Sequence, residues 1–138
     1  MANPYLDANV IVRPIVQDDP ARAALCRTYL SKLETGQETA DLVEATLAEV
    51  VYVLGSPRRY HLARNDIRAY LSGVLMFPGV SIAHKGTYLR ALDWYATLNI
   101  DFEDALIAAH VERTGAAAVV SFDRDFDRIP GIARREPQ

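Results

Sequence analysis

Short apolar runs alternate with longer segments of helical periodicity along this chain, and this alternation restricts the fold more than any other feature. The segments with helical periodicity are residues 9–13, 20–34, 44–55, 61–75, 85–98 and 102–114. The short runs that we expect to form strands are residues 5–6, 39–43, 80–83, 117–121 and 132–133. Strands separated by helices require crossover connections, so we predict an α/β fold with a short, mainly parallel sheet and helices on both faces.

Turn and cap residues support several of these boundaries. Pro20 suits the first turn of a helix, and Gly36 and Gly115 are placed to end the helices that precede them. Residues 117–121 form the clearest strand, because their apolar character is that of a parallel strand buried on both faces.

The length of 138 residues is that of one domain, so we predict a single domain over residues 1–138.

Cys26 is the only cysteine, which excludes an intramolecular disulfide and gives no sign of an oxidising compartment. The first residues lack the basic and apolar segments of a signal peptide. No apolar run approaches the roughly 20 residues that would span a bilayer. We therefore expect a cytoplasmic protein with no membrane partner.

The charge balance is slightly acidic, with 15 Lys and Arg against 18 Asp and Glu and a net charge of −3. Proteins that hold nucleic acid by charge alone usually carry a basic excess, so this balance disfavours a passive nucleic-acid binder. It suits an enzyme that gathers acids at one site and needs cations there.

Two acids follow predicted strands, where open α/β sheets bind their ligands. Asp7 comes directly after residues 5–6, and Asp123 lies two residues beyond the strand that ends at Ser121. Each has a structural alternative, because Asp is common in turns and at helix N-caps. Asn9 lies two residues after Asp7, where its amide can hold a carboxylate or a water in place.

Two further acids lie on predicted helices. Glu49 points away from the apolar stripe of its helix, which predicts either a solvated acid or one that faces a charge, a metal or a cleft. Asp104 lies in the first turn of the helix at residues 102–114, where acids favour the helix dipole and Asp101 can serve as the N-cap. It shares a face with Ala108, so we expect Asp104 to point inward and Glu103 outward.

Asp123 belongs to a run of acids at alternate positions that also includes Asp125 and Asp127. A calcium-binding loop of the EF-hand type is excluded, because the glycine and the glutamate that such a loop needs are missing. The remaining alternatives are a polar loop capped by Asp and an acid that reaches the sheet crevice.

Carboxylates that converge within a few ångströms cannot all ionise unless cations lie among them. Mg²⁺ and Mn²⁺ prefer such oxygen ligands together with water and phosphate. Metal ions held in this way activate water and stabilise the leaving oxygen of a phosphodiester, which is nuclease chemistry without a catalytic His or Cys.

The chain resembles the PIN-domain family of metal-dependent ribonucleases, and most closely the VapC-type toxins of bacterial toxin–antitoxin pairs. The resemblance covers essentially the whole chain and rests on four short motifs in family order. The motifs are Tyr5-Leu6-Asp7-Ala8-Asn9-Val10-Ile11-Val12, Thr46-Leu47-Ala48-Glu49-Val50, Asp104-Ala105-Leu106-Ile107-Ala108-Ala109 and Ser121-Phe122-Asp123-Arg124-Asp125-Phe126.

The resemblance implies a three-layer α/β/α sandwich and a catalytic metal site. The acids that it implies as catalytic and metal-binding residues are Asp7, Glu49, Asp104 and Asp123. The polar residues expected to support them are Asn9, Asp125 and Ser121, and Ser121 replaces a threonine that is commoner in the family. The resemblance further implies Mg²⁺ or Mn²⁺ as cofactor, RNA as substrate, a homodimer and a cognate antitoxin.

Two other functions remain open from the sequence. A haloacid-dehalogenase-type phosphohydrolase also begins with an Asp after its first strand, but it needs a second Asp where this chain has Asn9. A catalytically silent PIN-like module that binds RNA or a partner is the other alternative, although such modules typically lose some of the acids. We also expect an exposed apolar groove between the helices at residues 44–55 and 61–75, which would accept a helix of an antitoxin.

Overall fold

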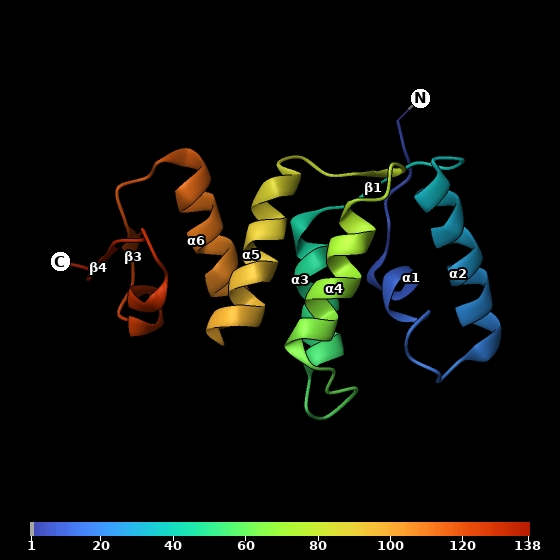
Figure 1. Cartoon of the computed structure of the whole chain (residues 1–138), viewed down its shortest axis with the longest axis horizontal. Coiled ribbons are helices and arrows are strands. Elements are labelled where there is room, and N and C mark those ends of the chain that lie inside the picture. The colour runs from blue at the N-terminus through green and yellow to red at the C-terminus, as the bar shows by residue number, and fades with distance from the viewer. Residues whose placement is uncertain (1) are drawn as a thin grey trace. The chain divides into compact units, whose positions relative to one another are not determined.

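The computed structural model describes residues 2–138 and contains two compact units, one that ends at Ala83 and one that comprises His84–Gln138 (Figure 1). Each unit has its own two-stranded parallel sheet. The predicted α/β fold with short parallel strands is therefore confirmed. Among residues 2–138, no helix has the length and apolar character needed to cross a membrane.

Within residues 2–83, the first unit contains four helices and a small parallel sheet. The helices are α1 (Ala8–Val12), α2 (Pro20–Thr35), α3 (Glu44–Gly55) and α4 (Arg64–Leu75). Strand β1 (Ala40–Asp41) pairs with β2 (Val80–Ser81) on one side, and Tyr5 forms a parallel bridge to Asp41 on the other. The backbone around Tyr5 is therefore fixed against β1, with the Leu6 N–H donating to the Asp41 carbonyl at 2.8 Å.

Helix α2 has the ends that the sequence predicts. The Asp19 carboxylate accepts a hydrogen bond from the Arg22 backbone N–H at 3.1 Å, and Pro20 occupies the first turn. Gly36 ends the helix with a φ of 78°, a left-handed conformation that glycine adopts without strain.

Gly79 joins the end of α2 to the sheet by a close backbone approach. Its N–H donates to the Leu33 carbonyl at 2.8 Å, and its own carbonyl accepts from the Ala40 N–H at 2.8 Å. A Cβ at this position would lie 2.2 Å from the Glu38 carbonyl oxygen and 2.7 Å from that of Leu33. The register of the sheet thus depends on a residue without a side chain.

The core of the first unit takes up the apolar faces of α3 and α4. Its fully buried side chains include Leu47, Val50, Leu54, Ile67, Leu71 and Leu75. The expectation of an exposed apolar groove between these helices is wrong, because most of the apolar residues meant to line it are buried in the core, and Val53 and Leu62 are only partly exposed.

The second unit is built on a pair of packed helices, α5 (Lys85–Leu98) and α6 (Phe102–Thr114). Two edge-to-face ring contacts join the two helices, Tyr88 with His110 at 6.0 Å and Tyr95 with Phe102 at 5.8 Å between centroids. Gly115 ends α6 with a φ of 70°. The 3₁₀ helix η1 (Arg124–Arg128) then connects β3 (Val119–Val120) to its parallel partner β4 (Arg134–Arg135).

The largest departures from the predicted elements are in the strands and at the start of α4. Each named strand has two residues, and the prediction of burial throughout residues 117–121 is wrong: Val119 is 7% exposed but Val120 is 61% exposed. Successive side chains of a strand point to opposite faces, so Val119 faces the interior and Val120 faces solvent. Helix α4 begins at Arg64, because His61 adopts a left-handed φ of 47° and the Leu62 N–H donates to the Leu54 carbonyl.

Candidate metal centre

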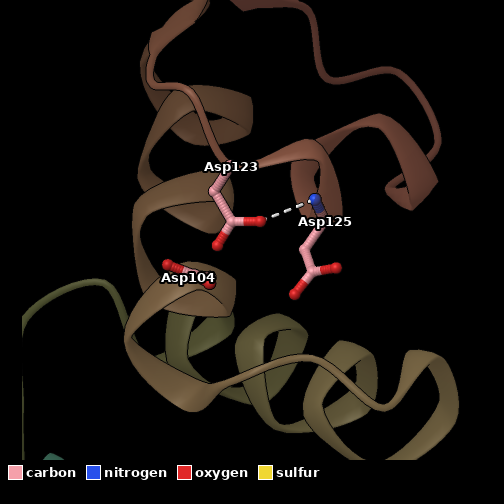
Figure 2. Close-up of side chains that lie close together, drawn as sticks. All are labelled: Asp104, Asp123 and Asp125. Carbon is pink, nitrogen blue, oxygen red and sulfur yellow. Dashed lines mark hydrogen bonds between the residues drawn. The ribbon is translucent and has the colours of Figure 1, made fainter.

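Three carboxylates of the second unit converge on one small space (Figure 2). Asp104, Asp123 and Asp125 each offer an oxygen atom, and these atoms lie within 4.8 Å of one another. Asp104 comes from the first turn of α6, Asp123 from the N-cap of η1 and Asp125 from within η1. Segments that are separate in the sequence thus bring three acids to one point.

Hydrogen bonds after β3 set the positions of two of these acids. The Ser121 hydroxyl accepts from the Asp123 backbone N–H at 2.9 Å, and the Asp123 carboxylate accepts from the Asp125 backbone N–H at 2.8 Å. Asp123 therefore caps η1, as one alternative from the sequence proposed, and it also faces Asp104 and Asp125. One carboxylate oxygen of Asp123 accepts the capping hydrogen bond, and the other oxygen does not take part in it.

The surroundings of Asp104 disfavour the charged form of its carboxylate. Burial and the nearby charges of Asp123, Asp101, Asp125 and Glu103 raise the pKa of Asp104 above its ordinary value. A divalent cation among these oxygens would remove both causes, because it replaces lost hydration and offsets the repulsion. An all-carboxylate donor set suits Mg²⁺ or Mn²⁺ and is a poor match for the nitrogen- and sulfur-rich sites of zinc.

The neighbouring acids differ in their partners. Asp125 forms an ion pair with Arg128 at 3.4 Å, and Arg128 also donates to the Leu98 carbonyl at the end of α5 at 2.8 Å. Asp127 turns away to Arg134, which it binds through both carboxylate oxygens at 3.0 and 3.3 Å. The alternating acids after β3 therefore divide between a cluster and a structural ion pair.

The two acids in the first turn of α6 differ in exposure as predicted. Glu103 is exposed and Asp104 is partly buried. The face that Asp104 shares with Ile107 and Ala108 is only partly covered, since Ala108 is fully buried but Ile107 is 45% exposed. Asp104 thus lies at the rim of the core, where its carboxylate remains accessible to a cation.

Asp7 lies in the first unit, at the N-cap position of α1. Its backbone is extended, with φ −88° and ψ 151°, and its side chain is exposed. Within the part of the chain that the structure describes, this carboxylate accepts no capping hydrogen bond from α1. Asn9 is also exposed and lies in the first turn of the same helix.

Glu49 also belongs to the first unit, on α3. It is exposed, while Leu47, Val50 and Val51 on the opposite side of the helix are buried. The orientation expected from helical periodicity is confirmed. Of the predicted catalytic acids, the structure brings Asp104 and Asp123 together, and the joint assignment of all four stays a prediction.

The sequence predicts Asp125 as a residue that supports the metal ligands. In the structure Asp125 offers an oxygen atom within 4.8 Å of those of Asp104 and Asp123, so it is itself a candidate ligand. The available signal was the alternation of acids after a strand. This signal does not distinguish Asp125 from Asp127, because the turn of η1 decides which of the two faces Asp104.

Comparison with known proteins gives one family. The family described as PIN domain matches residues 5–132, which span both units. No curated protein matches the chain.

Proposed function

Because this chain belongs to the PIN-domain family, we propose that it is a metal-dependent endoribonuclease that hydrolyses phosphodiester bonds of RNA. Proteins of this family are typically metal-dependent nucleases. The observation that carries the proposal is the convergence of Asp104, Asp123 and Asp125, whose oxygen atoms lie within 4.8 Å of one another. Asp7 and Glu49 complete the proposed site, and the family match across both units supports one functional domain over residues 1–138.

The proposed cofactor is Mg²⁺, with Mn²⁺ as an alternative, held by carboxylates of Asp7, Glu49, Asp104 and Asp123. When bound, such an ion activates water and stabilises the leaving oxygen of a phosphodiester. The chain's own residues hold and orient the cofactor. Asp104 supplies a partly buried carboxylate whose ionised form gains most from a cation, and Ser121 fixes the backbone of Asp123.

A cleavage assay with matched variants tests this proposal. Purified protein should degrade single-stranded RNA in Mn²⁺ and should stop in EDTA. Asp104→Asn should lose roughly 100-fold or more in rate, the usual cost of removing one electrostatic contact to the transition state. Glu103→Gln is the control, because it neutralises an exposed acid on the same helix turn and should keep activity near wild type.

Equal rates for wild type and Asp104→Asn, with both proteins folded, would contradict the nuclease proposal. Cleavage by wild type that persists at full rate in EDTA, but is lost in Asp104→Asn, would contradict the metal dependence of the proposal.

We further propose that the protein is the toxin of a toxin–antitoxin pair, a cytoplasmic homodimer that a cognate antitoxin inhibits. The support is the resemblance of its four motifs to VapC-type toxins. Expression alone should arrest bacterial growth, and co-expression with the protein encoded by the adjacent gene should restore it. Asp7→Asn should be harmless when expressed alone. Continued toxicity of Asp7→Asn, or normal growth with active wild-type protein present, would refute the toxin role.

A further inference from the structure

A pocket of about 370 Å³ opens beside Asp7 in the first unit. Its walls come from the segment before α1, from Val10 of α1 and from one side of α2. Its volume falls within the range of sites that hold small ligands. Because Asp7 is a proposed metal ligand, anything bound here lies next to the proposed reaction centre.

Tyr5 and Asp7 are placed on the same side of this pocket by the extended backbone between them. Alternate residues of an extended segment point the same way, and the intervening Leu6 is buried at 6% exposure. The Tyr5 ring is 70% exposed, although its backbone is paired with Asp41 of β1. Tyr5 therefore holds an exposed aromatic ring on a fixed backbone, and a planar group can stack on this ring.

Helix α2 supplies the opposite wall. Leu25 and Tyr29 lie four residues apart and so on one face of the helix, and Cys26 lies beside them. Leu25 is 71% exposed, so a large aliphatic side chain is open to solvent at this wall of the pocket. The lining is therefore mainly aromatic and aliphatic, and among the described residues that form it the acidic group is the Asp7 carboxylate.

We propose that this pocket binds one nucleobase of the RNA substrate, next to the phosphate that is cleaved, with the base stacked on Tyr5. This inference rests on the proposed ribonuclease function. A phosphate is a poor occupant, because the lining residues within 2–138 include a carboxylate and no Lys or Arg. A planar, uncharged base matches the aromatic and aliphatic walls, and stacking accepts any base because each has a π-face.

The stacking is tested by combining a substitution of Tyr5 with the removal of one base from the RNA. Tyr5→Ala should lower kcat/KM for a single-stranded RNA roughly tenfold, the usual scale for loss of one stacked base. The same substitution should have little effect on RNA that lacks the base at one position flanking the cleaved phosphate, because the partner is then already absent. Tyr5→Phe keeps the ring and should stay near wild type.

Tyr52→Ala is the matched control, since Tyr52 is also 70% exposed but does not line the pocket. Its effect on kcat/KM should be the same for intact and abasic RNA. If Tyr5→Ala is equally active or equally impaired on both RNAs at every flanking position, the pocket does not hold a base.

Cys26 provides a second readout that does not require catalysis. It is the only cysteine of the chain and lines the pocket, so its alkylation rate reports occupancy. A nucleoside 5′-monophosphate should slow alkylation of the full-length protein, whereas ribose 5-phosphate, which lacks the base, should not. Tyr5→Ala should weaken the protection.

The two readouts separate the failure of this inference from the failure of the proposed function. An unchanged alkylation rate at millimolar mononucleotide, or equal protection by ribose 5-phosphate, overturns the base pocket even if the enzyme cleaves RNA. Protection by the mononucleotide alone supports the pocket even if Asp104→Asn shows that the nuclease proposal is wrong.

Discussion

Asp104 is a carboxylate whose surroundings oppose its charge, and it is also a ligand of the proposed metal site. It lies at the first turn of α6, where the helix dipole favours an acid, yet burial and surrounding acids raise its pKa. The ionised form is therefore less favourable in the folded protein than in the unfolded chain. Such a conflict between stability and charge is common where a site must bind a cation.

Removing the Asp104 charge should stabilise the metal-free protein at neutral pH. Because the folded protein binds this proton more tightly than the unfolded chain, stability falls as pH rises from the ordinary value of 3.8 through the raised pKa. Asp104→Asn should thus be more stable than wild type at pH 7 in EDTA, and the two proteins should be equally stable below pH 3.8. Thermal unfolding across pH, with Glu103→Gln as control, measures the difference. A less stable Asp104→Asn at pH 7 would contradict this account.

The sequence predicts the orientation of side chains on the helices better than the conformation of the turn that follows β3. Helical periodicity correctly placed Glu49 away from the buried face of α3 and Asp104 further inward than Glu103. Periodicity does not predict the position of Asp125, because the conformation of η1 depends on hydrogen bonds that the side chains of Ser121 and Asp123 accept from the backbone. Periodicity describes regular elements, whereas a 3₁₀ turn is set by local side-chain bonds.

At the scale of elements, the stability of the protein should be far more sensitive to an alanine at Gly79 than to one at Gly73, the preceding glycine of the chain. A Cβ at Gly79 would meet backbone atoms of Glu38 and Leu33 at 2.2–2.9 Å. Gly79→Ala should cost about 1–3 kcal/mol or more, because backbone must move. Gly73 lies within α4 with nothing within 4 Å of its Cβ position, so Gly73→Ala should stabilise by about 0.5–1 kcal/mol. Urea denaturation compares them, and equal midpoints would contradict the close approach at Gly79.

Helices were predictable to within a few residues, whereas strands were not. The bounds of α3, α5 and α6 agree with the predicted ones, because apolar periodicity and Gly115 mark them clearly. Strands β1 to β4 are shorter than, or displaced from, the predicted runs, because pairing depends on which distant segment lies alongside. The contact of Gly79 with α2 is one such constraint, and no local pattern reveals it.

At the scale of the whole molecule, the proposed function requires both compact units. The PIN-domain match extends across them, and each contributes two of the four predicted catalytic acids. Asp104 and Asp123 are already close within the second unit, whereas Asp7 and Glu49 are proposed to act with them. If the four acids share metal, substitutions in different units should affect the same binding event.

Mn²⁺ affinity, measured by electron paramagnetic resonance titration, tests this coupling most directly. Asp7→Asn and Asp104→Asn should each weaken Mn²⁺ binding at least roughly tenfold, since even residues that only orient metal ligands typically contribute that much. The double variant should bind little more weakly than the worse single variant, because both changes disrupt one site. Wild-type affinity in Asp7→Asn, or losses that simply multiply in the double variant, would show that Asp7 and Asp104 do not serve the same metal.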